Sequence, residues 1–405
     1  MKIVKTFVIA LLFSLAAVVH AQQEAKNWFF GARGALSFGP NPAPYTPGTP
    51  TMNTQEGSAV ISDSTGNLLF YTDGLQIDGP THAVITGGTG LLGGSSATQS
   101  AVIVPWPDGK CDKYFVFTVE EQENHDIQHL RYSVVQISSG VASVLSKNTL
   151  LQSYVSEKLI GIADPSGGFL VMAHGYDKSN TSNPVNSEFY AFHVGAGGIT
   201  PGPVSTGFPH VTGPGGSSGV ASSGQMAFSP DGSKIACAVN SAFVEIYDFD
   251  ITTGKVMPGT GIKLNANQSF PNPQFQEYSP YGLAFGDNNT LYVSTISAPS
   301  RLYHIVINPL QVTLLKTGNG VAGVNYDIGQ LQWGLDHKIY VARDGSQTIS
   351  VIANPTGTAL TCGYQDTGAT LAAGATSRLG LPTIIQGPSP CSGVTINCPA
   401  GTTPT

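Results

Sequence analysis

The chain has 405 residues and a formal net charge of −7, with 49 glycines, 27 prolines and only 11% charged residues. Helix-rich proteins need charged helix surfaces and few glycines or prolines, so this composition argues against an all-α or α/β fold. The 41% hydrophobic content argues against a disordered chain. An all-β protein remains, and its acidic balance excludes nucleic acid as a partner, because phosphate binding needs clustered Lys and Arg.

The first 21 residues have the pattern of a secretory signal peptide. Lys2 and Lys5 precede an apolar stretch over residues 7–19, and a small-residue cleavage site follows. The mature chain should therefore begin near Gln22. No later segment reaches about 18 consecutive apolar residues, so we expect no transmembrane segment in the mature chain and a secreted or cell-surface location.

One unit recurs along the chain: an apolar strand, a turn rich in Asp, Gly and Asn, and a second strand rich in aromatic and β-branched residues. Such repeats, spaced by about 50 residues, are typical of the four-stranded blades of a β-propeller, as in WD40-like repeats. The sequence therefore predicts a single all-β propeller over residues 22–386. The six copies occupy residues 59–71, 102–117, 161–171, 226–236, 283–293 and 331–341.

Two further strand-like segments lie outside these copies, Trp28–Gly31 near the start and Leu381–Ile385 near the end. A blade shared between the termini would use both and would remove exposed sheet edges. We therefore expect seven four-stranded blades, closed by pairing of the N- and C-terminal strands, with six blades as the alternative. Residues 387–405, rich in Pro, Ser and Thr, are expected to form a linker or tail.

Five cysteines follow the predicted leader, and an odd number in an exported protein leaves at least one thiol unpaired. Cys237 lies in an apolar run and is expected to be buried and inert. Cys391 and Cys398 are close enough in sequence to bond or to remain unbonded, because spacing alone fixes no connectivity.

Several segments together resemble the N-terminal β-propeller of large secreted Bacteroidota surface proteins. In that family the propeller precedes repeat domains and a C-terminal signal for type IX secretion, in proteins associated with gliding motility or adhesion. The resemblance implies export and a surface role, with further repeat domains if the sequence is part of a longer protein. The segments are Asn27–Gly31, Asn53–Gly57, Gly66–Gly74, Gly90–Gly93, Thr98–Ser100, Ser156–Leu159, His174-Gly175 and Ser377–Pro382.

Polar residues at the starts of inner strands, or just past them, form the first candidate site. Equivalent positions of successive blades gather around the propeller axis, where a mixed ring of side chains can bind a small polar ligand or sugar. The favoured alternative is that they form structural pairs, because buried charges must be paired. These residues are Glu56, Asp73, Gln99, Glu157, Lys158, His174, Arg343 and Arg378.

The most polar segment of the chain is the second candidate site. Its carboxylates and imidazoles suit calcium or a transition metal, but their spacing matches no known metal-binding loop, which favours a solvated loop. We therefore expect no cofactor, with calcium as the one candidate. The residues are Glu120, Glu123, His125, Asp126 and His129.

The sequence contains no nucleophile elbow, phosphate-binding loop or dinucleotide fingerprint. We therefore expect a non-enzymatic binding or adhesion module that presents propeller loops to a glycan or a surface protein. One alternative is a hydrolase with an axial site, either a metal-dependent lactonase-like enzyme or one that cleaves polysaccharides, in which Glu157 or Asp73 serves as acid or base and His174 as proton shuttle. The other alternative is an architectural spacer.

Overall fold

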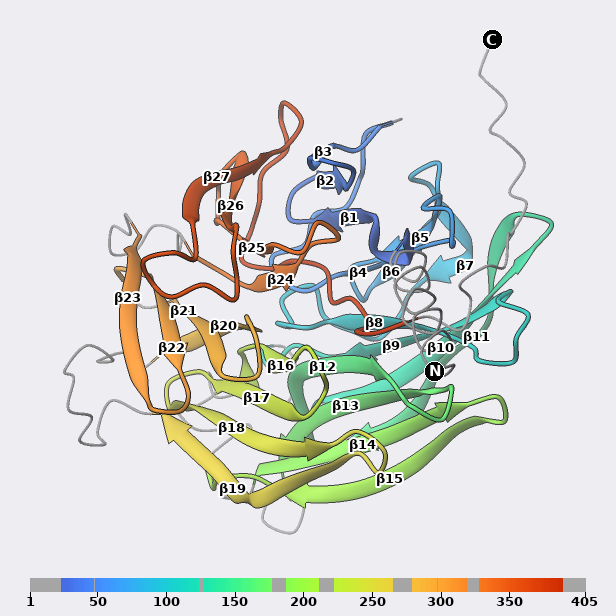
Figure 1. Cartoon of the computed structure of the whole chain (residues 1–405). Coiled ribbons are helices and arrows are strands. Elements are labelled where there is room, and N and C mark those ends of the chain that lie inside the picture. The colour runs from blue at the N-terminus through green and yellow to red at the C-terminus, as the bar shows by residue number, and fades with distance from the viewer. Residues whose placement is uncertain are drawn as a thin grey trace, which may run out of the picture.

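A computed structural model describes residues 23–46, 48–123, 127–176, 187–210, 222–264, 279–296, 298–318 and 328–388. Almost all regular structure in these ranges is β-strand, apart from the three-residue 3-10 helix η1 (Gln23–Ala25). The sheets follow one another around a ring, and the last strands, β26 and β27, lie beside the first three, as Figure 1 shows. This all-β, propeller-like architecture is the predicted fold class.

The ring begins with a three-stranded sheet and an eight-stranded sheet. The three-stranded sheet contains β1 (Asn27–Phe30), β2 (Gly34–Ser37) and β3 (Ala43–Pro44). The eight-stranded sheet has the order β4-β5-β6-β7-β11-β10-β9-β8. Its strands are β4 (Ala59–Ser62), β5 (Leu68–Thr72), β6 (Gln76–Asp78), β7 (Val84–Thr89), β8 (Ala101–Pro105), β9 (Lys113–Val119), β10 (His129–Ser138) and β11 (Val141–Ser153).

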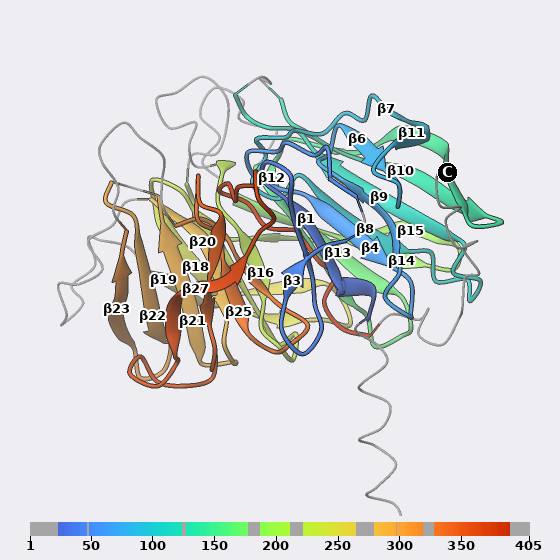
Figure 2. The same cartoon turned by 90° about the horizontal axis from the view of Figure 1, so that it is seen from above.

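Four four-stranded sheets, each in sequence order, complete the ring. Figure 2 shows the ring from above, with the strands of the later sheets on the left and those of the earlier sheets on the right. The first two contain β12 (Val155–Ala163), β13 (Phe169–Tyr176), β14 (Ser187–Gly195) and β15 (Gly198–Thr206), then β16 (Met226–Phe228), β17 (Lys234–Val239), β18 (Phe243–Asp250) and β19 (Lys255–Leu264). The last two contain β20 (Pro280–Phe285), β21 (Thr290–Thr295), β22 (Arg301–Val306) and β23 (Gln311–Thr317), then β24 (Leu331–Trp333), β25 (Ile339–Val341), β26 (Thr348–Ile352) and β27 (Tyr364–Thr370).

All six predicted strand-turn-strand units form antiparallel pairs, from β4 with β5 to β24 with β25. The turn between β4 and β5 shows why the pattern folds this way. The Asp63 carboxylate accepts hydrogen bonds from the backbone N–H groups of Thr65 and Asn67, both at 2.9 Å. Gly66 has a φ of 87°, a conformation that glycine adopts without steric strain.

The expectation of seven separate four-stranded blades is wrong. The first sheet has three strands, and the strand groups β4–β7 and β8–β11 are joined into one sheet where Thr86 of β7 pairs in parallel with Ser143 of β11. The long outer strand β11 pairs with β7, the outer strand of the neighbouring group. Neither strand is then left as an exposed sheet edge.

Ring closure also differs from the expectation. The N- and C-terminal parts meet through isolated bridges, Ala32 with Thr376 and Ser58 with Pro382. Within the part of the chain that the structure describes, no C-terminal strand completes the first sheet. The first sheet instead packs against the last, with the ring of Trp28 lying 4.7 Å from Phe38 and 5.8 Å from Tyr340 between centroids. Aromatic packing of this kind holds the two ends of the ring together.

Leu381–Ile385, expected as the closing strand, is a bound segment of irregular backbone. Leu381 donates its N–H to the Gln330 side chain (2.9 Å) and Thr383 donates its own to the Ser58 carbonyl (2.8 Å). Gln386 donates its N–H to the Gly161 carbonyl (2.9 Å). The segment 379–387 thus crosses the inner strands β4, β12 and β24 and acts as a plug in the axis; we call it the axial plug.

Candidate functional site

Three glutamines hold the centre of the ring, each placed just before an inner strand. Gln99 bonds both backbone groups of Met226 on β16, at 2.8 and 3.1 Å, although another sheet lies between them in sequence. Gln225 accepts from Leu283 N–H (2.9 Å) and donates to the Leu331 carbonyl (2.8 Å). These side-chain amides link inner strands across the axis by hydrogen bonds to backbone groups. Their donors and acceptors are therefore already used within the protein.

The third glutamine, Gln330, donates to the Thr98 carbonyl and accepts from Leu381 of the axial plug. Sequence reasoning identified Gln99 but missed Gln225 and Gln330. The signal was a shared position: Gly224-Gln225 and Gly329-Gln330 each lead directly into an inner strand.

Beside these amides lies a buried charged centre made of Glu56, Glu157 and Lys158, three of the predicted axial residues. The exposed fractions are 8% for Glu56, 2% for Glu157 and 0% for Lys158. The Lys158 ammonium donates to the carbonyls of Ser222 (2.5 Å) and Ser223 (2.9 Å). Lys158 therefore supplies a positive charge deep inside a region that also holds two carboxyl groups.

The Glu157 carboxyl group is fully engaged by protein donors. One oxygen accepts from the backbone N–H (3.2 Å) and hydroxyl (3.0 Å) of Thr98, and the other accepts from the Gln122 N–H (3.0 Å). Burial and the charge of Glu123 raise the pKa of Glu157 to about 7. Burial, followed by the charge of Glu157, holds the pKa of Glu56 well above its usual value.

The raised pKa of Glu157 predicts that the contribution of this group to stability falls as the pH rises. A carboxyl group whose pKa is higher in the folded state stabilises it fully below the unfolded pKa, near 4.5, and loses that contribution as the pH rises through about 7. Between pH 6.5 and 8.5 the loss from this group is about 1 kcal/mol. The buried histidines His174 and His210, whose pKa values are lowered, act in the opposite direction, because in the unfolded chain their imidazoles are about half protonated at pH 6.5 and neutral at pH 8.5. Their contribution is the same in the wild type and in Glu157→Gln, so the difference between the two isolates Glu157.

Urea unfolding at the two pH values measures this effect, and Glu157→Gln, which cannot ionise, should remove it. An equal change of stability in the wild type and in Glu157→Gln would show that the raised pKa is not the cause.

The other predicted axial residues lie away from this centre. Asp73 caps a turn through bonds from Leu75 N–H (2.9 Å) and Gln76 N–H (3.0 Å). Arg343 donates to the Asp366 carbonyl at 3.3 Å, and Arg378 lies 3.8 Å from the Asp344 carboxylate with its side chain 33% exposed. The structure thus groups Glu56, Gln99, Glu157 and Lys158. Asp73, Arg343 and Arg378 lie elsewhere.

His174 is also off the axis, on β13 and completely buried. Its Nε2 atom lies 2.5 Å from the Ser187 hydroxyl and 3.5 Å from the Glu245 carboxylate. Sequence reasoning did not single out Glu245, which lies between the buried residues Val244 and Ile246 on β18. Nothing in the sequence indicates that it points toward His174.

The predicted metal segment is described only in part, because His125 and Asp126 lie outside the described residues. Glu120 accepts from His129 Nδ1 (2.7 Å), and its other oxygen pairs with Arg131 (2.5 Å). Glu123 is exposed. A guanidinium group therefore already neutralises the only buried carboxylate among the predicted ligands that the structure describes.

A cavity of about 710 Å³ is lined by residues of the inner strands, with Gln99 and Gln225 in its wall. Its walls are mostly aliphatic and aromatic, and the axial plug forms one side of it. Trp333 is half-buried and donates its indole N–H to the Phe285 carbonyl at 2.8 Å. The principal walls are Ile61, Ile103, Phe228, Phe285, Trp333 and Ile385.

Comparison with one solved structure supports the fold. A putative 6-phosphogluconolactonase from Bacteroides fragilis is 10% identical, with a TM-score of 0.50, covering 89% of this chain and 98% of that one. A luciferin-regenerating enzyme is 16% identical, with a TM-score of 0.42, covering 82% and 94%. The Dos1 propeller is 8% identical, with a TM-score of 0.43, covering 81% of each chain. At these identities the likeness concerns the fold alone.

No known protein-family profile matches the chain, and neither does any curated protein sequence. Among the residues that the structure describes, no helix has the length and apolar character needed to span a membrane.

Proposed function

We propose that the chain is an extracellular binding module that receives apolar side chains of a protein partner in its 710 Å³ cavity. The carrying observation is the composition of the cavity wall. Aliphatic and aromatic side chains such as Ile103, Phe228 and Trp333 favour an apolar occupant, whereas a sugar needs many polar groups to replace its hydration.

Two features support binding over an axial hydrolase. The carboxyl groups of Glu56 and Glu157 are buried, and Glu157 is saturated by donors from Thr98 and Gln122. The axial plug also occupies the space beside them, since Leu379 accepts from Gln330 N–H at 2.8 Å. A general acid must reach the atom that it protonates, and these carboxyl groups reach only the protein itself.

The proposal predicts that filling the cavity abolishes binding. Ala227 lies on β16 in the cavity wall and is partly buried. Ala227→Trp should weaken the affinity for a purified surface-protein ligand at least tenfold, about 1.4 kcal/mol. The matched control is Ala373→Trp, at an exposed position outside the cavity wall, which should leave the affinity unchanged.

The measurement is retention of purified surface proteins and polysaccharides by the immobilised chain, with released products scored in the same samples. Circular dichroism and thermal unfolding confirm that both variants fold. Retention that is equal for Ala227→Trp and the wild type would exclude the cavity as the binding site. Release of product from a polysaccharide or lactone by the wild type would replace the binding proposal with the hydrolase alternative.

A further inference from the structure

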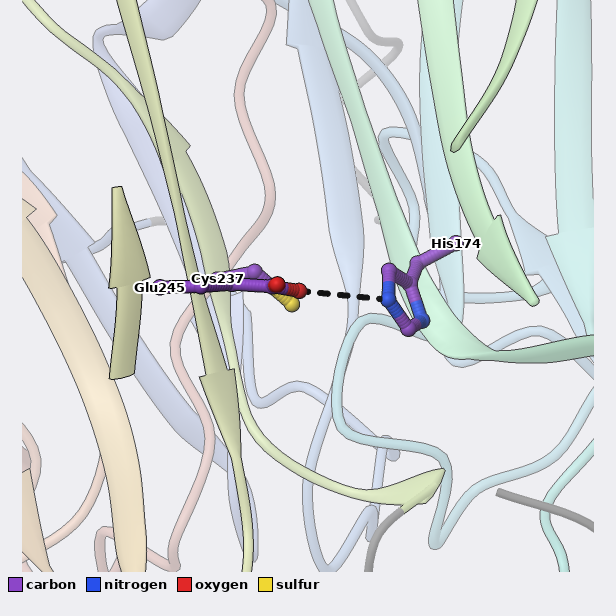
Figure 3. A group of neighbouring side chains, drawn as sticks. All are labelled: His174, Cys237 and Glu245. Atoms are coloured by element: carbon purple, nitrogen blue, oxygen red, sulfur yellow. Dashed lines mark ion pairs between the residues drawn. The ribbon is translucent and has the colours of Figure 1, made fainter. Parts of the chain in front are cut away.

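Three side chains with metal-ligand chemistry meet inside the protein, between the sheet β12–β15 and the sheet β16–β19. Cys237 on β17 and Glu245 on β18 are direct cross-strand partners, so their side chains project side by side from one face. Figure 3 shows both pointing toward the ring of His174, which comes from β13 of the neighbouring sheet. One ligand atom of each lies within 4.8 Å of the others, and all three residues are buried.

The distances suit a shared ion better than a direct hydrogen bond. His174 Nε2 and Glu245 Oε1 are 3.5 Å apart, which is long for an N–H···O bond. Two nitrogen or oxygen ligands around one tetrahedral zinc ion lie about 3.3 Å apart, given metal–ligand distances of about 2.0 Å. Among the described residues Glu245 Oε1 forms no well-aligned hydrogen bond although its residue is 0% exposed, and the Cys237 thiol beside this carboxyl group is a weak donor. A buried carboxylate oxygen without a well-aligned donor is unfavourable unless a cation binds it.

Neighbouring groups orient the ligands from outside, as in established metal centres. His174 Nδ1 lies 3.3 Å from the Ser156 hydroxyl, which leaves Nε2 facing the carboxylate. The second Glu245 oxygen accepts from the Tyr247 hydroxyl (2.8 Å) and the Phe208 N–H (3.1 Å). The ring of His210 stacks on His174 with centroids 5.3 Å apart, and its Nε2 atom has no partner.

From this arrangement we propose that His174, Cys237 and Glu245 form a structural site for a divalent transition metal of the zinc class. The mixed nitrogen, sulfur and oxygen ligands favour zinc over calcium, because calcium takes oxygen ligands only. Thiolate and carboxylate carry two negative charges, which balance the ion. Lys158 then remains the counter-charge for Glu157 and Glu56.

Binding requires two local changes. The thiol proton of Cys237 is released to solvent as the sulfur–metal bond forms, and the Ser187 hydroxyl, now 2.5 Å from His174 Nε2, moves aside. Because the site is enclosed, we expect the ion to enter while the chain folds.

The experiment refolds the full chain with its cysteines reduced before dilution, in excess Zn²⁺ or Co²⁺ and under oxidising conditions, and measures metal content after dialysis. We expect one bound zinc per chain, and with cobalt the intense visible bands of tetrahedral coordination plus a thiolate charge-transfer band in the near ultraviolet. Cys237→Ser should remove the charge-transfer band and weaken zinc binding at least 100-fold.

Cys362→Ser is the matched control, because among the described residues Cys362 is the other buried free cysteine, and it lies in the loop between β26 and β27, away from the site. It should bind zinc as the wild type does. Absence of stoichiometric zinc, or cobalt binding without a thiolate band in the wild type, would overturn the proposal even if Cys237→Ser fails to fold. Undiminished binding by a folded Cys237→Ser would place the metal elsewhere and overturn it as well.

Discussion

Lys158→Met is expected to lower the free energy of unfolding by about 3 to 5 kcal/mol at pH 8, because it leaves buried negative groups without their cation. Lys158 is fully buried, and although burial lowers the pKa of its ammonium group, the nearby carboxyl groups of Glu157, Glu245 and Glu56 favour the charged form. Methionine fills a similar volume but cannot donate to the two carbonyls that the ammonium now binds. Both the orphaned carbonyls and the unbalanced carboxylates destabilise the folded chain.

The destabilisation caused by Lys158→Met should be smaller at low pH than at high pH. Burial raises the pKa of Glu56, Glu157 and Glu245, so these groups lose their charge at a higher pH than exposed carboxyls do. At pH 5 Glu157, whose pKa is about 7, is largely neutral and needs no counter-charge. The difference in unfolding free energy between Lys158→Met and the wild type should therefore be smaller at pH 5 than at pH 8.

Urea unfolding at both pH values measures the difference. Lys110→Met is the matched control, since Lys110 is exposed and its substitution should change stability by less than about 0.5 kcal/mol. If Lys158→Met were as stable as Lys110→Met at pH 8, the charged centre would not require a cation, and its residues would be free to act on a ligand.

The repeating unit was predictable because it is a local property. Alternating apolar residues and the Asp63 turn specify a hairpin without reference to the rest of the chain, and the same holds near Asp231, whose carboxylate accepts from Ser233 N–H at 2.9 Å. Position near the axis was also partly predictable, since Glu56, Gln99, Glu157 and Lys158 all precede or begin inner strands. The hydrogen bonds and charge interactions that these residues form were not predictable, because they depend on contacts between sheets that are distant in the sequence.

The end of the ring was the hardest part to predict. Leu381–Ile385 has the composition of a strand, and nothing local distinguishes a strand that completes a sheet from a segment that fills an axis. The deciding features are glycines that permit close backbone approach: a Cβ atom at Gly380 would overlap the Glu56 carbonyl, and one at Gly329 would overlap the Leu379 carbonyl. Such contacts appear only in three dimensions.

The axial plug leads to the second large prediction: Leu381→Ala should destabilise the protein by about 2 to 5 kcal/mol. Leu381 is 1% exposed and packs in the cluster that joins the first sheet to the last, near Trp28 and Tyr340. Truncation leaves a cavity where the plug meets both sheets. If the plug closes the ring, truncating Leu381 should lower the free energy of unfolding as much as truncating a leucine in the core of a sheet does.

Leu360→Ala provides the control, because Leu360 is 97% exposed and loses the same three carbon atoms without leaving a cavity. It should alter the unfolding free energy by less than about 0.5 kcal/mol. Proteolysis gives a second readout: in Leu381→Ala the plug should detach more readily, so cleavage after Arg378 should become faster than in Leu360→Ala. Equal stability and equal cleavage rates in the two variants would mean that the plug is held by its backbone hydrogen bonds to β4, β12 and β24 alone, and that ring closure rests on the aromatic contacts between the first and last sheets.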